Sequence, residues 1–132
     1  MMRRGILLAT LALVLSACST AAPRVNSVFD CTTYVQQPKA LTLYCADAGQ
    51  VLREIRWFNW GELSATGEGI VDTKVCDPNC AEGETVSTKV KITLLDAREV
   101  DGTSLFTTAQ LLYAETPPGH PNVENVALAT GR

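Results

Sequence analysis

Cys76 and Cys80, separated by three residues, are the residues in this sequence whose type and spacing most clearly suggest a chemical role. Such a pair can bind a metal ion, exchange electrons or close a loop as a disulfide. Redox pairs usually have two intervening residues and lie at a helix N-terminus, where the helix dipole lowers the thiol pKa. Pro78 and Asn79 favour a turn instead. The spacing therefore favours a structural disulfide over a redox centre.

The N-terminus indicates the compartment in which these cysteines function. Arg3 and Arg4 precede a short, uncharged apolar run that extends from Gly5 to Ala17. This run is shorter than the ~20 residues that a membrane-spanning helix needs. A positive start followed by a short apolar stretch is typical of a secretory signal. We therefore expect an exported protein.

Residues 15–18, Leu-Ser-Ala-Cys, resemble the lipobox of bacterial lipoproteins. In that family, signal peptidase II cleaves before the cysteine, which then carries acyl chains. The resemblance implies a lipoprotein signal peptide over residues 1–17 and a lipid anchor on Cys18, which several acyl chains would make firm. The alternative is an ordinary secretory signal that is cleaved near residues 19–22.

The chain that remains after residues 1–17 is long enough for one domain only, and its charge makes that domain acidic. The chain has 132 residues and a formal net charge of −3, which becomes more negative when the signal arginines are removed. This balance argues against nucleic acid as a partner and against electrostatic docking on anionic lipid. We expect a flexible, lipidated tether over 18–30, a β domain over 31–116, and a Pro-rich C-terminal segment or edge strand over 117–132.

Alternating apolar and polar residues predict strands over residues 39–45, 53–60, 63–75 and 85–97. Asp101-Gly102 predicts a hairpin turn, and the composition of residues 105–114 favours another strand over a short helix. No segment has the period of an amphipathic helix. The sequence therefore predicts an all-β domain, an antiparallel β-sandwich or small barrel held by two disulfides.

Four cysteines remain if Cys18 is lipidated: Cys31, Cys45, Cys76 and Cys80. An even count in a small exported domain predicts two disulfides, and a zinc site made of four thiolates is the weaker alternative. In a β-meander, Cys45 and the Cys76–Cys80 segment reach the same end of the sheet. We therefore expect a long-range bridge from Cys45 to Cys76 or Cys80, with Cys31 bound to the remaining cysteine. The alternative pairs Cys31 with Cys45 and Cys76 with Cys80.

Trp57 and Trp60 are candidates for either core or binding surface. Residues three apart on a strand point to opposite faces, so we expect at most one of the two in the core. The favoured interpretation places Trp57 in the core beside Ile55 and Trp60 over the glycines of the next strand. The alternative leaves Trp60 and Phe58 exposed as a candidate binding surface.

Other residues give weak signals for catalysis or metal binding. His120 is the single histidine, and its proline-rich surroundings predict a solvated loop residue rather than a catalytic base. Several carboxylates near the cysteine loop could offer oxygen ligands to calcium, but their spacing matches no EF-hand loop and favours a solvated rim. These residues are Glu68, Asp72, Asp77, Glu82 and Glu84. We predict no catalytic residue, cofactor or metal.

The joint pattern L-x-L-x-C-A-D, W-x-x-W-G, A-x-G-x-G and C-x-P-x-C-A-x-G, from Leu41 to Gly83, resembles small uncharacterised secreted proteins and lipoproteins of actinobacteria. The resemblance implies an exported, disulfide-containing β domain and supplies no catalytic residue. We expect a non-catalytic envelope lipoprotein on the extracytoplasmic side of the cell membrane. Its partner would be an envelope protein or cell-wall component. The alternative is an accessory subunit or enzyme of envelope metabolism.

Overall fold

The predicted all-β fold is confirmed by a computed structural model that describes residues 17–131. The predicted signal peptide lies outside the described residues, apart from Ala17. The described chain contains eight strands and no helix. They are β1 (Val28–Phe29), β2 (Tyr34–Val35), β3 (Leu41–Thr42), β4 (Gln50–Trp60), β5 (Ala65–Lys74), β6 (Thr85–Val100), β7 (Thr103–Tyr113) and β8 (Val123–Ala127).

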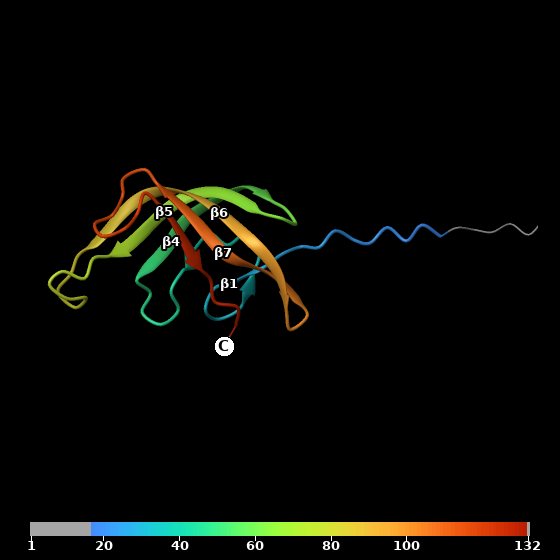
Figure 1. The fold of residues 1–132 in the computed structure, drawn as a ribbon, viewed down its shortest axis with the longest axis horizontal. Helices are drawn as coiled ribbons and strands as arrows, with labels where there is room; N and C mark the ends of the chain where they lie inside the picture. Colours follow the sequence, from blue (N-terminus) through green and yellow to red (C-terminus); the bar gives the residue numbers. More distant parts are fainter. Residues whose placement is uncertain (1–16, 132) are drawn as a thin grey trace, which may run out of the picture.

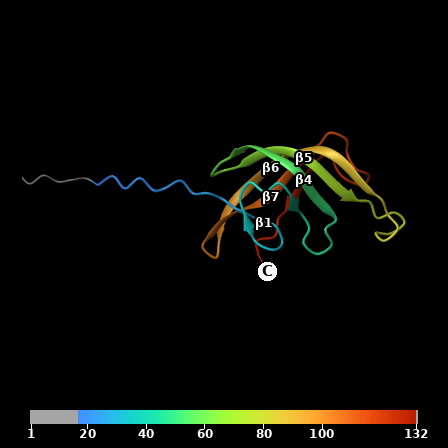
Figure 2. The same ribbon diagram turned by 180° about the vertical axis from the view of Figure 1, so that it is seen from behind.

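Strands β3 to β8 form one six-stranded antiparallel meander, in which each strand pairs with its neighbour in the sequence. The sheet arches into a half-barrel, and the short β1–β2 hairpin lies beneath the arch (Figures 1 and 2). Of the two predicted architectures, the structure therefore resembles an open barrel rather than a sandwich.

β-Bulges explain the curvature of this sheet. The register of β4 against β5 shifts between Arg53 and Arg56, where Glu54 has a φ of 52°. A second register shift in the same strand lies between Trp57 and Asn59. An extra residue on one strand bends that strand and increases its twist. The bulges therefore curl the sheet around its apolar face.

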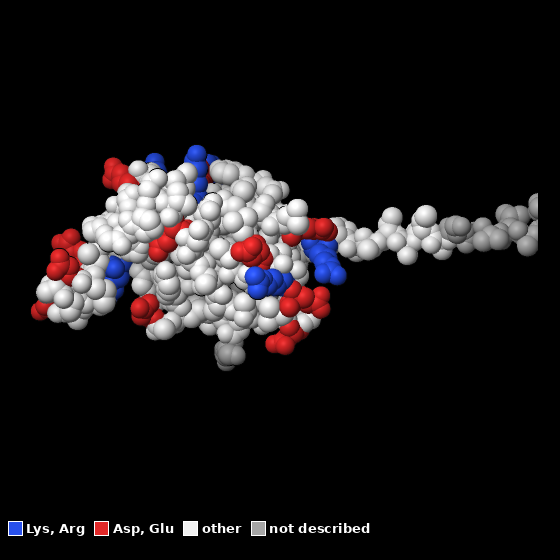
Figure 3. All heavy atoms as spheres, viewed as in Figure 1, with Lys and Arg blue, Asp and Glu red and all other residues white. Residues whose placement is uncertain are grey.

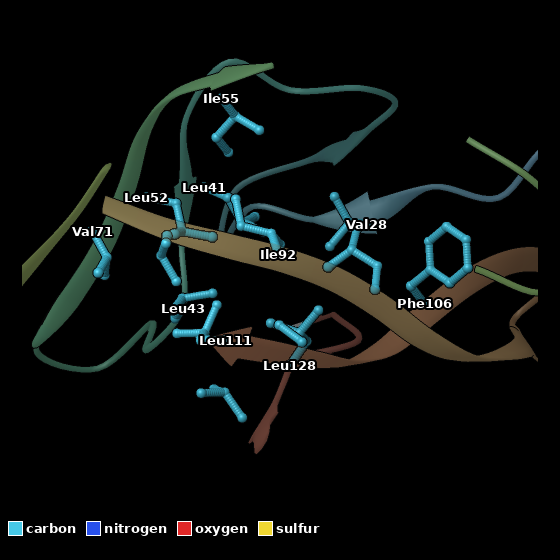
Figure 4. Packing of buried hydrophobic residues seen from close by; sticks show 14 of the residues in the cluster. Val28, Leu41, Leu43, Leu52, Ile55, Val71, Ile92, Phe106, Leu111 and Leu128 are labelled. Atoms are coloured by element: carbon cyan, nitrogen blue, oxygen red, sulfur yellow. The ribbon is translucent and has the colours of Figure 1, made fainter. Parts of the chain in front are cut away.

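The core lies on the concave face of the half-barrel (Figure 4). Val90, Ile92 and Leu94 of β6 point inward and are buried, as their alternation predicts. They pack with side chains from β1, β4, β7 and the C-terminal segment. Burial of each such side chain stabilises the fold by about 1.5–3 kcal/mol. Other members of the core are Val28, Leu41, Leu43, Leu52, Leu111, Phe106 and Leu128.

The domain is larger than predicted at both ends. The expected tether over 18–30 is too long, because Asn26 to Phe29 are buried and residues 17–25 alone are exposed. Ser27 forms a parallel bridge with β7, donating its N–H to the carbonyl oxygen of Ser104 at 2.9 Å. At the C-terminus, the edge-strand alternative is the observed one, since β8 pairs with β7 and buries Val126.

The meander places its connections at two opposite ends. The loops 43–49, 75–84 and 114–122 join β3 to β4, β5 to β6 and β7 to β8 at one end, which we call the mouth. The β4–β5 and β6–β7 turns lie at the other end, where the extended N-terminal segment leaves the domain (Figures 1 and 2). We call this the tether end. The predicted turn at Asp101-Gly102 is observed there, with φ values of 48° and 79°.

Candidate ligand-binding site at the mouth

The disulfides follow the local pattern, so the expected long-range bridge from Cys45 to Cys76 or Cys80 is wrong. Cys31 is bonded to Cys45, and Cys76 is bonded to Cys80. Cys31 lies in the turn between β1 and β2, which packs beneath the arch and so reaches the loop after β3. The prediction failed because it assigned residues up to 30 to a flexible tether. The expectation that the cysteine loop shares an end of the sheet with Cys45 is correct.

The loop that carries Cys76 and Cys80 closes on itself. The N–H of Val75 donates to the carbonyl oxygen of Glu84 at 2.8 Å across the base of the loop. The Asn79 side-chain oxygen accepts hydrogen bonds from the backbone N–H groups of Ala81 and Glu82, each at 3.0 Å. Asparagine commonly forms such turns. The disulfide therefore lies within an already compact loop, where it forms one wall of the mouth.

A cavity of about 280 Å³ lies at the mouth, between the three loops. Tyr44 and Asp47 line it from the first loop, the Cys76–Cys80 disulfide from the second, and His120 from the third. Gln50 and Lys74 contribute from the adjoining strand ends. Ligand sites often lie in the mouths of β-barrels, where loops meet over a rigid scaffold. This cavity is our candidate functional site.

A chain of buried polar side chains leads inward from this cavity. The Gln50 Nε2 group donates to the Thr73 hydroxyl at 3.2 Å and to the Tyr113 hydroxyl at 2.8 Å. Tyr113 in turn donates to the Glu124 carboxylate. Glu124 also accepts from His120 Nδ1 at 2.9 Å. The chain connects β4, β5, β7 and β8 with the third mouth loop and fixes their relative positions.

The orientation of the Gln50 amide follows from this chain. Tyr113 has one hydroxyl proton and gives it to the Glu124 carboxylate, so it can only accept from Gln50. Both hydrogens of Gln50 Nε2 are then used, on Thr73 and Tyr113. The Gln50 Oε1 atom is buried without a hydrogen-bond partner among residues 17–131. Most buried polar atoms in folded proteins have a hydrogen-bond partner, and Gln50 lines the mouth cavity.

Burial and hydrogen bonding shift the pKa values of this chain. Burial raises the pKa of Tyr113, and its hydrogen bond to the anionic Glu124 raises it further. Burial alone would also raise the pKa of Glu124, but the hydrogen bonds from Tyr113 and His120 outweigh burial and lower it. Desolvation, followed by the charge of Glu124, raises the pKa of Tyr44 at the rim. At neutral pH the chain therefore holds one partly buried carboxylate beside two neutral phenols.

His120 is not the solvated loop residue that its surroundings predicted. Its side chain is 24% exposed and contacts Glu124, four residues later on the edge strand. A histidine held by a carboxylate is two-thirds of a catalytic triad. The described lining of the mouth, however, contains no serine or threonine, and both of its cysteines are disulfide-bonded. The lining therefore presents hydrogen-bonding groups to a polar ligand.

Trp57 and Trp60 lie on the same face, which corrects the expectation that they point to opposite faces. The register of β4 shifts again between Trp57 and Asn59, so both indoles pack against the core. Their ring centroids are 4.8 Å apart, in an edge-to-face arrangement. Trp60 Nε1 donates to the carbonyl oxygen of Asn26 at 2.9 Å. Trp60 is therefore an internal contact, whereas Phe58 is the exposed member of the predicted surface.

A glycine of the next strand accommodates a tryptophan, as predicted, but the tryptophan is Trp57 rather than Trp60. A Cβ at Gly67 would lie 2.9 Å from Trp57 Cε3 and 2.6 Å from the Arg56 carbonyl oxygen. No residue larger than glycine fits there without movement of the backbone.

The acidic residues near the cysteine loop do not converge on a common point. Asp72 accepts from Arg53 at 2.8 Å, and Glu68 accepts from Arg56 at 2.5 Å, both on the outer face of the sheet. Asn79 donates to Glu82 within the loop. Within residues 17–131, no three histidine, cysteine or carboxylate side chains are grouped as a metal site.

A second hollow, of about 700 Å³, lies on the outer face of the sheet. Ile70, Lys89, Lys91 and Leu112 line its centre, and the Arg56–Glu68 ion pair lies at its margin. It is larger than the mouth cavity, but strand residues form most of its lining and one loop alone contributes to it, through Ala114 and Asn122. The mouth is the better candidate because its lining comes from three loops and continues into a buried polar chain.

Comparisons with known proteins supply no function for this chain, so the candidate site is assigned from its geometry alone. No helix within residues 17–131 is long and apolar enough to cross a membrane. The chain matches no protein-family model, no curated protein and no solved structure.

Proposed function

We propose that this protein is a lipid-anchored, non-catalytic binding module of the cell envelope, and that it holds its ligand at the mouth. The anchor is Cys18, on the extracytoplasmic side of the membrane, and the ligand is an envelope protein or cell-wall component. One observation carries the proposal: the mouth and the N-terminal segment lie at opposite ends of the domain (Figures 1 and 2). An anchor at Cys18 would point the mouth away from the membrane.

The N-terminal segment has the properties that an anchor requires. Cys18 is exposed and is the one cysteine outside the two disulfides. The first backbone contact with the domain is made at Arg24, whose N–H donates to Glu62 at 2.9 Å. Seven residue steps from Cys18 to Val25 span at most about 25 Å when fully extended. The segment is therefore long enough to clear lipid headgroups while keeping the domain close to the membrane.

The mouth has the properties of a binding site. Its lining combines an aromatic ring, a carboxylate, a lysine and a histidine within a small volume. The first and third loops supply the ring, the carboxylate and the histidine, and the end of β5 supplies the lysine. The disulfide and the Gln50–Tyr113–Glu124 chain hold the bases of these elements in place. A few polar groups on a rigid frame fix the orientation of a ligand.

The anchor is tested by replacing Cys18 with serine in the native host. We expect the wild-type protein to incorporate a labelled fatty acid and to sediment with membranes. The Cys18→Ser variant should lose the label and leave the membrane fraction. A variant that remained acylated and membrane-bound would exclude Cys18 as the anchor.

The mouth is tested by site-specific photo-cross-linking in intact cells. A photoreactive phenylalanine analogue placed at Tyr44 reports contacts at the mouth, and the same analogue at Lys91 reports contacts on the outer face. We expect a discrete cross-linked species from Tyr44 that is absent from Lys91. Cross-links from Lys91 alone would indicate that the binding surface is on the outer face, and this result would contradict the proposal.

A further inference from the structure

The most exposed large apolar side chains of this protein gather at the tether end. Leu63 is 86% exposed, Phe58 63% and Val25 57%. No other large hydrophobic residue in the described chain exceeds 45%. Leu63 and Phe58 belong to the β4–β5 hairpin, and Val25 is the last residue of the N-terminal segment before the domain. We call these three residues the apolar tip.

Four hydrogen bonds join residues 24–26, where the N-terminal segment meets the domain, to the β4–β5 hairpin. The Asn26 amide donates to the carbonyl oxygens of Gly61 and Glu62, at 3.0 and 2.8 Å, and Trp60 donates to the carbonyl oxygen of Asn26. The Arg24 N–H donates to the Glu62 carboxylate. The hairpin therefore cannot move away from the point at which the chain leaves the domain.

We propose that the apolar tip contacts the surface of the lipid bilayer and enters its headgroup region. This inference rests on the proposed anchor at Cys18. An extended chain of seven residue steps allows at most about 25 Å between Cys18 and Val25, so the tip cannot be far from the bilayer. Three side chains are too few for stable membrane binding alone, but the anchor keeps them at high local concentration near the surface.

The charges around the apolar tip indicate a contact that is apolar rather than electrostatic. Arg24 and Arg56 have exposed side chains that form ion pairs with Glu99 and Glu68, at 3.7 and 2.5 Å. Glu62, Glu99 and Asp101 lie at the same end, and acidic side chains flank the base of the N-terminal segment (Figure 3). A surface that carries both positive and negative charges gains little electrostatic attraction from anionic lipid. Binding by the tip should therefore not depend on anionic lipid or on salt concentration.

The two tryptophans allow a direct test. The chain contains Trp57 and Trp60 only, and both lie on the hairpin strand that ends at the apolar tip. Protein that begins at Cys18 retains every described residue that contacts the domain, and Cys18 is its one free thiol. Cys18 is coupled to a maleimide-bearing lipid in phosphatidylcholine vesicles whose acyl chains carry bromine near the headgroup. Bromine quenches tryptophan fluorescence at short range.

We expect the coupled wild-type protein to be quenched by brominated lipid. A Phe58→Ser/Leu63→Ser variant should lose most of this quenching while its coupling and unfolding temperature stay unchanged. The matched control is Leu112→Ser/Val123→Ser, which removes two apolar side chains, 40% and 45% exposed, from the outer face. The control should be quenched like the wild type. The wild-type quenching should also persist in high salt.

Two results would overturn the inference: no quenching of the coupled wild type, or equal quenching of the wild type and the tip variant. Either would leave the tip as a contact for another protein. The coupling chemistry supplies the anchor, so this experiment does not depend on acylation in cells. Failure of Cys18 acylation in the host would contradict the proposed function, whereas absence of quenching here would contradict the tip contact alone.

Discussion

The hydroxyl of Tyr113 on β7 donates a hydrogen bond to the carboxylate of Glu124 on β8, and it accepts one from the Gln50 amide on β4. Tyr113 thus connects the edge strand to the far side of the half-barrel. Tyr113→Phe removes the hydroxyl and leaves a buried amide and a partly buried carboxylate each short of one partner. We expect a loss of about 1–3 kcal/mol in the free energy of unfolding, measured by urea denaturation.

Tyr34→Phe is the matched control for that variant. Tyr34 is exposed and its hydroxyl donates to the carbonyl oxygen of Thr130 at 3.3 Å. Its loss should change stability by less than about 0.5 kcal/mol. Equal effects of the two substitutions would show that the buried chain does not stabilise the domain.

Acid should destabilise the domain partly through Glu124. Because its folded-state pKa is lowered, the ionised form stabilises the fold. This contribution is fully present above the unfolded pKa, about 4.3, and is lost as pH falls through the folded pKa. Asp72, whose pKa is lowered by its hydrogen bonds from Arg53 and Ser87, acts in the same direction. Glu124→Gln should therefore be less stable at pH 7 but lose less stability between pH 5 and pH 3, as unfolding curves at each pH will show.

The two disulfides should differ in their contribution to stability. The Cys31–Cys45 bond closes a loop with a sequence separation of 14, and the Cys76–Cys80 bond one of 4. Loop-closure entropy predicts that the Cys31→Ala/Cys45→Ala variant loses about 3 kcal/mol of its free energy of unfolding. The Cys76→Ala/Cys80→Ala variant should lose less. Thermal unfolding of both double variants measures the difference. Non-reducing peptide mapping that recovered Cys45 joined to Cys76 or Cys80 would contradict the pairing itself.

Gly67→Ala should be strongly destabilising. The new Cβ would lie 2.6 Å from the Arg56 carbonyl oxygen, which belongs to the backbone and cannot move easily. Overpacking of this kind costs about 1–3 kcal/mol, and it should shift tryptophan emission because Trp57 is displaced. Gly49→Ala is the control, since its Cβ would meet only the Asp47 side chain, at 3.2 Å. Comparable effects at the two positions would exclude steric overlap as the cause.

The alternation of apolar residues was sufficient to predict the meander and the inward face of β6. It also contained an unused signal for the site. Gln50 and Tyr113 each lie two residues from an inward-facing leucine, Leu52 and Leu111, so the same alternation places them inside the sheet. Polar residues at inward positions near strand ends predict a buried polar network. The site was not predicted because motif spacing selects histidines, carboxylates and tryptophans, whereas Gln50 and Tyr113 belong to no motif.

The remaining errors arose where local spacing does not determine the structure. Trp57 and Trp60 share a face because a bulge adds a residue between them, and no side chain in that segment specifies a bulge. The disulfide pairing depended on the position of residues 26–35, a short hairpin with too few residues for a clear alternation. The position of this hairpin is determined by contacts with β7, which is distant in the sequence. A local pattern of residues cannot predict such contacts.

The parallel bridge between Ser27 and β7 also has a mechanical consequence. Ser27 donates to Ser104 and accepts from Phe106 along the first half of β7, and β8 pairs with its second half. In a domain held at Cys18 and pulled at the mouth, tension runs along these strands, transverse to the hydrogen bonds between them. The bonds at Ser27 are then loaded in shear and must break together rather than one after another. With an anchor at Cys18 and a partner at the mouth, this junction would therefore be loaded in the direction in which its hydrogen bonds resist force most strongly.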